Sequence, residues 1–271
     1  MSKKKTEEES STEIAQVNSG SMVPYDYGED AGVGYENQTA ADINIPVLKL
    51  LQSLSPQVVD EQAKPGQWYN TVTEEVCADR DTGFLFVPAL IKHYYAEFIP
   101  REQSGGFQGI HEVHSREVAD AIKNATAFGR YKLENGNELV ETYSVFGVFC
   151  SEDGTPELMA MIPLKSTAIR PYKNWNTRIQ MFASGNPNRP PIYANLTRIS
   201  AVLKKNDSGS FYVPVFKSAN PAGIQQSLLT PDDPRFQMAK ACKSFIMSGD
   251  AKVDYSQQDD QRTDVVDETP F

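Results

Sequence analysis

The sequence predicts an α+β protein in which β-strands predominate and helices are few. Runs of aromatic and β-branched residues, bounded by turn residues, recur along the middle of the 271-residue chain. Helical periodicity is confined to short segments. Both ends, residues 1–42 and 250–271, are acidic and poor in large apolar groups, so we expect a disordered arm and a disordered tail. One domain, residues 43–249, remains between them.

Strand patterns dominate the first half of this domain. The apolar run 45–51 has a periodicity that suits a strand or a short helix equally. The aromatic and β-branched run 68–73 follows a Lys-Pro-Gly turn and predicts a strand. Residues 84–91 and 93–98 predict long strands, and Pro88 implies an edge strand or a bulge there.

A helix and a hairpin are predicted next. Ser115 suits the N-cap of a helix over residues 115–124, because apolar residues follow it at helical spacing. An Asn-Gly turn then joins residues 131–133 to the alternating run 139–150 as a hairpin. Another strand is expected over residues 157–164.

The last part of the domain mixes helices with a second hairpin. Residues 167–182 carry apolar groups at a spacing that fits a helix or an irregular segment. The clearest hairpin of the chain joins residues 192–205 to residues 210–217 through an Asn-Asp-Ser-Gly turn. An Asp-Pro pair opens a predicted helix over residues 236–247, which Gly249 ends.

The formal net charge of -10 argues at first sight against a nucleic-acid partner, because phosphate binding requires lysine and arginine. The distribution of charge reverses this argument. Residues 1–42 carry three lysines against nine acids, and residues 250–271 carry two basic residues against seven acids. Residues 165–217, in contrast, hold nine basic residues against the single acid Asp207. The sequence thus predicts a cationic patch between two acidic ends.

Several classes of protein are excluded by the same composition. No apolar run approaches the roughly 20 residues that span a bilayer, and the first residues lack the apolar stretch of a secretion signal. We therefore expect a cytoplasmic protein without a membrane partner. Cys77, Cys150 and Cys242 lie far apart without a C-x-x-C pair, which argues against a disulfide framework and a thiolate zinc site. No metal and no cofactor are expected.

The residues also argue against catalysis. His111 and His114 lack the i, i+4 spacing of the zinc-protease helix, and no further histidine or cysteine completes four ligands. A solvated polar loop is the preferred interpretation. No Walker loop, G-x-S-x-G elbow or Rossmann glycine fingerprint is present. We therefore predict that the protein is not an enzyme, with a metal-dependent nuclease using the two histidines as the remote alternative.

The chain ends in an acidic segment with one large apolar group at its terminus. Acidic tails are common solubilising segments, but that role does not explain Pro270 and Phe271. A proline that restricts the backbone, followed by a phenylalanine with a free α-carboxylate, presents a ring and an anion together. This pair suits an apolar pocket rimmed by arginine or lysine on another protein. The last two residues therefore predict a docking peptide.

The last five residues, Asp267, Glu268, Thr269, Pro270 and Phe271, resemble the Asp-Asp-Ile-Pro-Phe tip of bacterial single-stranded DNA-binding proteins. Phage counterparts also end in acidic residues and phenylalanine. The resemblance implies that the tip recruits replication and recombination proteins, such as polymerase, helicase and nuclease, and competes with DNA for the basic groove of the domain. Thr269 replaces the isoleucine of that tip, which removes apolar contact. The match covers these five residues alone.

Residues 45–52, 64–73 and 173–177 are also similar to stretches of uncharacterised phage proteins. Together the resemblances imply a bacteriophage single-stranded DNA-binding protein with an elaborated OB-fold-like barrel, since a short five-stranded barrel leaves much of residues 43–249 unexplained. Such a protein, a monomer or weak dimer, coats and protects exposed strands during replication, recombination and repair in the infected bacterial cell. The alternatives are a recombination annealing protein and a non-DNA adaptor or inhibitor that occupies a host replication-protein pocket.

Strand binding without base preference requires a cationic groove for phosphates and flat rings for bases. Residues 165–217 interleave both, and the DNA-binding residues predicted there are Tyr172, Lys173, Trp175, Arg178, Arg189, Tyr193, Arg198, Lys204, Lys205 and Tyr212. Tyr172 and Trp175 are expected to face solvent or DNA, because polar side chains surround them in the sequence. The aromatic residues expected in the core are Phe182, Phe211 and Phe216.

Two further clusters on predicted strands complete the candidate DNA-binding residues, namely Lys92, Tyr94, Tyr95 and Arg101 in one and Arg130 and Lys132 in the other. Successive side chains of a strand point to opposite faces. Only one of Tyr94 and Tyr95 is therefore expected to face the DNA while the other is buried, and the sequence leaves open which.

Overall fold

The computed structural model describes residues 28–30, 33–34, 44–103, 105–126, 129, 131–206, 209–249 and 254–256. The first five of these belong to a unit spanning Met1–Gln38, in which Gly28–Asp30 forms one turn of 3-10 helix, η1. The other described residues belong to a second unit, Thr39–Phe271. The expected disordered arm 1–42 and tail 250–271 lie almost entirely outside the described residues.

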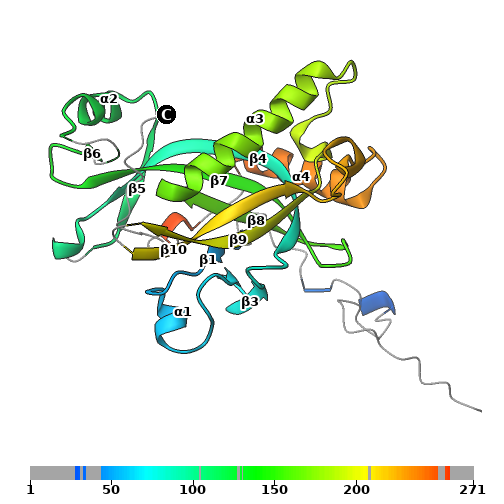
Figure 1. Ribbon diagram of the computed structural model, residues 1–271, viewed down its shortest axis with the longest axis horizontal. Coiled ribbons are helices and arrows are strands. Elements are labelled where there is room, and N and C mark those ends of the chain that lie inside the picture. Colours follow the sequence, from blue (N-terminus) through cyan, green and yellow to red (C-terminus); the bar gives the residue numbers. More distant parts are fainter. Residues whose placement is uncertain are drawn as a thin grey trace, which may run out of the picture. The chain divides into compact units, whose positions relative to one another are not determined.

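The second unit is built around a seven-stranded antiparallel sheet (Figure 1). Its strands are β4 (Phe84–Phe98), β5 (Phe107–Glu112), β6 (Tyr131–Lys132), β7 (Glu138–Cys150), β8 (Pro156–Lys165), β9 (Thr197–Asn206) and β10 (Gly209–Ser218). The strand order is β10-β9-β4-β7-β6, with β5 paired to β4 and β8 paired to β7. The prediction of an α+β fold with predominant β-strands is confirmed.

The two longest strands, β4 and β7, are neighbours in the middle of this sheet. They pair almost end to end, from Leu85 opposite Cys150 to Phe98 opposite Glu138. Their register shifts after Pro88, where an extra residue bends β4. A proline has no N–H to donate to a ladder, so Pro88 was expected on an edge strand or at a bulge. The structure places it at a bulge.

A second sheet has three short strands in the order β1 (Leu48–Leu50), β2 (Trp68–Asn70) and β3 (Glu75–Ala78). The one-turn helix α1 (Pro56–Val59) lies between β1 and β2 in the chain. The apolar run 45–51, which fitted a strand or a helix, therefore contains a strand. A parallel bridge between Val47 and Met161 joins this run to β8.

The three longer helices are α2 (Arg116–Lys123), α3 (Ile169–Gly185) and α4 (Pro234–Ser248). Two of them begin at capping residues that the sequence identifies. The Ser115 hydroxyl accepts a hydrogen bond from the N–H of Val118 at the start of α2. The Asp233 carboxylate accepts one from the N–H of Arg235 at the start of α4, and Gly249 ends that helix with a φ of 82°.

Short 3-10 helices lie in the connections, namely η3 (Arg101–Gln103), η4 (Ser166–Ala168), η5 (Ile192–Ala194) and η6 (Gln225–Ser227). The strand predicted over residues 192–205 begins only at Thr197, because η5 precedes it. Pro190 and Pro191 lie directly before this turn, and prolines restrict the backbone and offer no N–H to a ladder. No helix among the described residues is both long and apolar enough to cross a bilayer.

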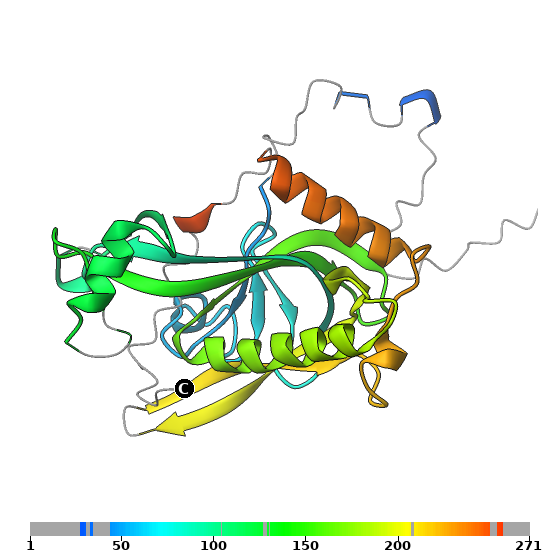
Figure 2. The ribbon, with the colours of Figure 1, turned by 90° about the horizontal axis from the view of Figure 1, so that it is seen from above.

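A helix covers each face of the long strands, with α3 on one side of β4 and β7 and α4 on the other (Figure 2). Successive side chains of β4 alternate, so Phe86 joins the α3 cluster and Val87 joins the α4 cluster. The segment 167–182, which fitted a helix or an irregular segment, lies mostly in helix α3. Its apolar side packs into the α3 cluster through Ile169, Tyr172, Trp175 and Ile179. Helix α4 contributes Phe236, Ala239, Cys242 and Ile246 to the α4 cluster.

Strands β8, β7, β4, β9 and β10 form one continuous antiparallel path. This path is compatible with the expected OB-fold-like barrel, a partly open Greek key of five strands. Among the described residues, β8 and β10 form no ladder with each other. A cavity of about 40 Å³ marks this seam, and residues of β8, β10 and the small sheet line it, including Pro163, Pro214, Leu50 and Trp68.

Candidate nucleic-acid interface

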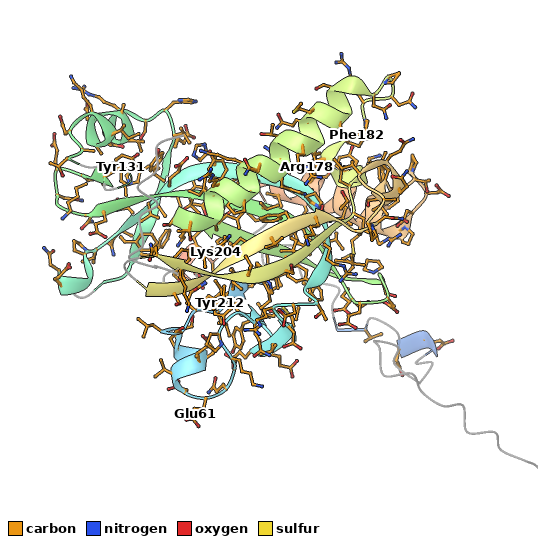
Figure 3. The ribbon with its side chains drawn as sticks, viewed as in Figure 1. Glu61, Tyr131, Arg178, Phe182, Lys204 and Tyr212 are labelled. Atoms are coloured by element: carbon orange, nitrogen blue, oxygen red, sulfur yellow. The ribbon has the colours of Figure 1, made fainter. Side chains whose placement is uncertain are left out.

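Residues 158–206 contain eight lysines and arginines and no aspartate or glutamate. This acid-free segment comprises most of β8, the whole of α3 and the whole of β9. The fold brings α3 beside the β9–β10 hairpin, because Trp175 of α3 stacks on Phe216 of β10 with ring centroids 5.2 Å apart. Figure 3 labels Arg178 on α3 and Lys204 on β9. Six of the eight cations therefore lie on two adjacent elements, three on α3 and three on β9.

The outer face of the hairpin carries two cross-strand pairs, Arg198 opposite Lys217 and Lys204 opposite Phe211, which we call the hairpin surface. Lys204 and Lys217 are exposed, and Arg198 and Phe211 are half-buried. Cations placed directly opposite each other destabilise a sheet. Within the described part of the chain, no carboxylate forms an ion pair with these three cations. Arg198 and Lys217 therefore concentrate positive charge on this face.

The solvent side of α3 adds further cations to this region. Arg170, Asn174 and Arg178 are exposed and recur every four residues, so they share one face of the helix. Lys173 is half-buried beside them, and its Nζ lies 3.6 Å from the Glu141 carboxylate. Arg178 is therefore at the surface of α3, while Arg198 and Lys204 lie on the hairpin face opposite to Phe216, the ring against which α3 packs. Lys205 is also exposed, on the face of β9 opposite to Lys204.

Tyr172 and Trp175 were expected to face solvent or DNA, and this expectation is wrong. They are buried, with 2% and 6% of their surface exposed. Tyr172 lies against Tyr143 with ring centroids 4.9 Å apart, and burial raises its pKa to about 12. A helix has about 3.6 residues per turn, so the polar residues that neighbour these rings in the sequence point away from them. The two rings belong to the core.

Tyr94 and Tyr95 do point to opposite faces of β4, but neither is accessible, with 4% and 6% exposed. The Tyr94 hydroxyl pairs with the Ser144 hydroxyl at 2.7 Å. Tyr95 packs near α2 against Tyr131, with ring centroids 5.9 Å apart. Burial, followed by the charge of Glu141, raises the pKa of Tyr95 above its ordinary value. The expectation that one of the pair faces DNA fails because both faces of the strand are covered here.

The aromatic residues expected in the core divide into two groups. Phe216 is buried, with 7% of its surface exposed. Phe182 and Phe211 are half-buried. The core expectation is therefore confirmed for Phe216, while Phe211 keeps part of its ring at the hairpin surface.

Three other predicted residues lie apart from the hairpin and α3. Arg189 is exposed in the turn after α3, with a φ of 41°. Tyr193 packs edge-on against Phe236 of α4, with ring centroids 4.9 Å apart. Lys92 lies on the α4 side of the sheet, with its Nζ 5.6 Å from the centroid of the Phe146 ring. The fold does not gather these residues with the hairpin surface.

Tyr212 is half-buried in β10, and its hydroxyl accepts a hydrogen bond of 3.3 Å from Arg80. Lys132 is exposed next to α2. Arg130, the side chain of Arg101 and the predicted docking tip 267–271 lie outside the described residues.

Sequence reasoning missed a ring pair formed by His93 of β4 and Tyr143 of β7, whose centroids are 4.0 Å apart with planes at 10°. Glu141 joins them, because its Oε1 lies 3.0 Å from Nε2 of His93. Burial works to raise the pKa of Glu141, but the His93 hydrogen bond and the charge of Lys173 outweigh it and hold this pKa below its usual value. Each residue is visible in the sequence, but their pairing depends on the register of two strands about fifty residues apart.

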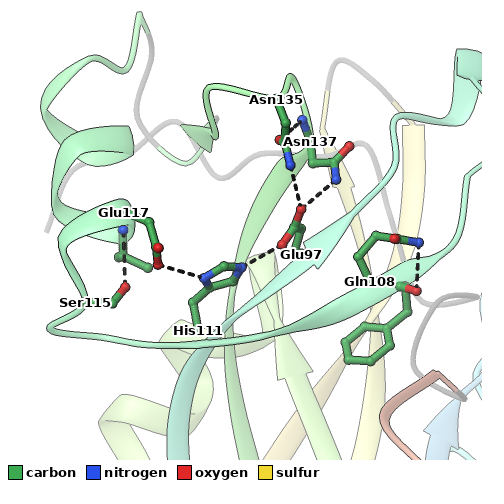
Figure 4. Close-up of polar contacts among 9 residues, drawn as sticks. Glu97, Gln108, His111, Ser115, Glu117, Asn135 and Asn137 are labelled. Atoms are coloured by element: carbon green, nitrogen blue, oxygen red, sulfur yellow. Dashed lines mark hydrogen bonds and ion pairs between the residues drawn. The ribbon is translucent and has the colours of Figure 1, made fainter.

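A groove of about 570 Å³ beside α2 has the opposite electrostatic character. Glu97, Glu117, Asp120 and Glu134 line it, against the cations Arg116 and Lys132. Figure 4 shows His111 between two of these carboxylates, with Nε2 2.7 Å from Glu97 and Nδ1 3.5 Å from Glu117. This excess of acids disfavours a phosphate chain.

The histidine pair in the sequence does not form a ligand cluster in the fold. His114 is exposed, and His111 is engaged by carboxylates. Within the residues that the structure describes, no three histidine, cysteine, aspartate or glutamate side chains lie close enough to hold a metal ion.

Comparisons with known proteins place the chain in a phage family. Neither a search of curated proteins nor a search of solved structures gave a match. A family model does match residues 17–252, which is most of the chain and all of the described sheet. The chain therefore belongs to the family of Pam3 phage gp34-like proteins.

Proposed function

We propose that this phage protein binds single-stranded DNA through the hairpin surface and α3, without catalysing a reaction. The observation that carries the proposal is the acid-free segment 158–206, of whose eight cations three lie on α3 and three on the adjacent strand β9. Lysine and arginine on such a surface neutralise phosphates and release their counterions. The half-buried ring of Phe211, directly opposite Lys204, offers a flat group for an unstacked base.

The arrangement of strands supports the same proposal. An OB-fold binds oligonucleotides on the face of its second and third strands and at the loop between its fourth and fifth strands. Numbered in chain order, the five strands of this path are β4, β7, β8, β9 and β10, so β7 and β8 are second and third and β9 and β10 are fourth and fifth. Lys204 and Lys205 are exposed close to the end of β9, next to that last loop. An OB-fold arranged along this path would take its ligand beside Lys204 and Lys205, which supports the proposal.

Membership of a phage family directs the proposal to an infected bacterial cell, where we expect the protein in the cytoplasm. The resemblance of residues 267–271 to the tip of bacterial single-stranded DNA-binding proteins directs it to replication, recombination and repair. The protein coats and protects exposed strands as a monomer or weak dimer. Its C-terminal residues 267–271 recruit replication and recombination proteins, such as a polymerase, a helicase or a nuclease. A phenylalanine ring that follows a proline and acidic residues fits an apolar pocket rimmed by basic residues.

The test is fluorescence anisotropy of the full-length protein with a labelled oligothymidylate over a range of salt concentrations. We expect the logarithm of the affinity to fall with the logarithm of salt by about 0.7 per phosphate contact. A duplex of the same length should bind more weakly, because its bases are not available to rings. Absence of binding at low ionic strength, or equal affinity for the duplex, contradicts the proposal. If the protein also pairs complementary DNA strands in the same samples, its function is annealing instead of coating.

A further inference from the structure

Tyr255 follows α4 in the chain and lies on the same face of the long strands. Residues 254–256, drawn in orange-red, are on the α4 side of β4 and β7 in Figure 2. The Tyr255 ring packs against the α4 cluster and against a second cluster that contains Tyr94 and Phe98 of β4 and Phe107 of β5. We call these three rings the ring pocket. Its cluster contains no residue of α4, so Tyr255 contacts a separate part of the sheet.

The strands themselves hold the ring pocket in place. Phe98 pairs directly with Phe107 in the β4–β5 ladder, and their ring centroids are 5.7 Å apart. The Tyr94 hydroxyl pairs with the Ser144 hydroxyl at 2.7 Å. A pocket whose rings are already ordered loses little conformational entropy when another ring binds.

Tyr255 contacts two of the three rings directly. It meets Tyr94 edge-on, with centroids 5.5 Å apart and planes at 78°, and it lies nearly parallel to Phe107 at 6.5 Å and 29°. Both arrangements are favourable between aromatic rings. Burial raises the pKa of Tyr255 above its ordinary value, because a partly buried phenol is harder to ionise. The ring is thus seated in the pocket.

The sequence around Tyr255 offers few other apolar contacts. Residues 250–271 contain seven acids and only two aromatic residues, Tyr255 and Phe271. Of the three described residues in this segment, 254–256, only Tyr255 belongs to an apolar cluster. The Asp254 carboxylate accepts a hydrogen bond of 3.0 Å from the N–H of Ser256, which supports a local turn at the ring.

We infer that the ring pocket is an anchoring site for the C-terminal segment, which Tyr255 attaches to the sheet and can leave without unfolding of the domain. Sixteen residues, 256–271, follow the anchor, and fully extended they reach about 55 Å. Release moves the point of departure back to Gly249, after which the 22 residues 250–271 reach about 75 Å. The anchor itself is independent of the proposed function. Its consequence, control over how far residues 267–271 reach toward a partner, rests on that function.

An anchor and a ring that completes the core predict different results. Local release of an anchor exposes the neighbouring backbone to a protease while the sheet stays folded. Loss of a core ring lowers the stability of the whole domain. Trypsin distinguishes the two, because it cuts after Lys252, close to Tyr255, and after Arg262, beyond it.

The experiment is limited trypsin proteolysis of the full-length protein, followed by intact-mass spectrometry. We expect Tyr255→Ala to speed the cut after Lys252 by about 5- to 100-fold, from the loss of two ring contacts, and to leave the cut after Arg262 unchanged. Tyr255→Phe keeps the ring and should behave like the wild type. Phe271→Ala removes the other aromatic residue of the segment and is the matched control, with no change expected at Lys252.

The pocket is tested from its other side by Phe107→Leu, which should also speed the cut after Lys252. Equal rates at Lys252 in the wild type and Tyr255→Ala overturn the anchor. Loss of the fold in Tyr255→Ala, measured by circular dichroism, assigns the ring to the core and overturns it as well. These measurements involve neither DNA nor a partner protein. A faster cut in Tyr255→Ala therefore supports the anchor even if strand binding or recruitment fails in its own test.

Discussion

The side-chain amide of Gln52 pairs with both backbone polar groups of Tyr212, as a neighbouring strand would. Its Oε1 accepts a hydrogen bond of 2.8 Å from the Tyr212 N–H, and its Nε2 donates one of 3.0 Å to the Tyr212 carbonyl. The two residues are 160 positions apart in the sequence. This contact lies at the seam where β8 and β10 form no ladder, so one side chain joins the small sheet to the hairpin.

Loss of this amide should destabilise the fold. Gln52→Ala leaves the N–H and carbonyl of Tyr212 without their partner in a partly buried position, which costs about 1–3 kcal/mol per unsatisfied group. Urea unfolding measures the loss in the free energy of unfolding. Gln180→Ala, at an exposed position of α3, is the control and should change little. Equal losses in the two variants would mean that the seam contact contributes nothing specific.

Gly66 should tolerate no side chain, because of the ring above it. A Cβ on Gly66 would lie 2.6 Å from the Tyr212 ring, and its φ is 89°. Gly136 has a similar φ of 86° but open space around the same position. Both alanine variants carry backbone strain, so the additional loss in Gly66→Ala, of about 1–3 kcal/mol, measures overpacking. Thermal unfolding compares them, and combining Gly66→Ala with Tyr212→Ala should recover part of the loss.

Removing single cations from the hairpin surface should weaken DNA binding in a salt-dependent way. Lys204→Gln and Lys217→Gln each remove one exposed charge from this surface. Each variant should lower affinity for a single strand and make the slope of log affinity against log salt shallower by about 0.7. Lys123→Gln, on α2, is the matched control with an exposed lysine outside the surface. A slope that falls equally in all three variants would argue against a defined site.

Stability should depend on pH through Glu97. Burial works to raise its pKa, but hydrogen bonds from Asn137, His111 and Asn135 outweigh burial and hold the pKa below its ordinary value. A carboxyl with a depressed folded-state pKa stabilises the protein above its unfolded pKa of about 4.3. This contribution is lost as pH falls through the folded pKa.

Glu97→Gln should therefore make the free energy of unfolding less dependent on pH below about pH 5. Urea unfolding at a series of pH values tests this expectation. Glu102→Gln, at an exposed position of η3, should retain the wild-type dependence. The interpretation fails if the Glu97 variant shows the same pH profile as the wild type.

Truncation of the tip should separate DNA binding from recruitment. A chain that lacks Pro270 and Phe271 keeps the hairpin surface and α3, so its affinity for single strands should be retained or increased. The same chain should no longer retain replication proteins in a pull-down from host extract, because the Phe271 ring is removed. A truncated chain that recruits the same proteins would disprove the docking role.

Local signals in the sequence predicted most elements and several of their ends. Ser115, Asp233 and Gly249 mark helix ends because capping depends on a few neighbouring residues. The hairpin around residues 206–209 was predicted for the same reason, since turn residues and alternation are local. The OB-fold-like path was compatible with these elements but required the order of strands to be known.

Exposure of individual rings could not be predicted in the same way. The polar neighbours of Trp175 suggested solvent, yet the helix directs this ring onto Phe216. Tyr94 and Tyr95 alternate as expected, but separate groups cover the two faces of their strand. Burial depends on what packs against a face, and that partner comes from another part of the chain.

The amino-acid sequence by itself determined the types of the elements, the acidic ends and the acid-free basic segment 158–206. Long-range packing established where those cations gather and which rings remain accessible. His93 and Tyr143 illustrate the difference, because they stack only through the register of β4 against β7. The reason is physical. Periodicity and local charge can be read from residues close together in the sequence, whereas strand register and burial depend on contacts between residues tens of positions apart.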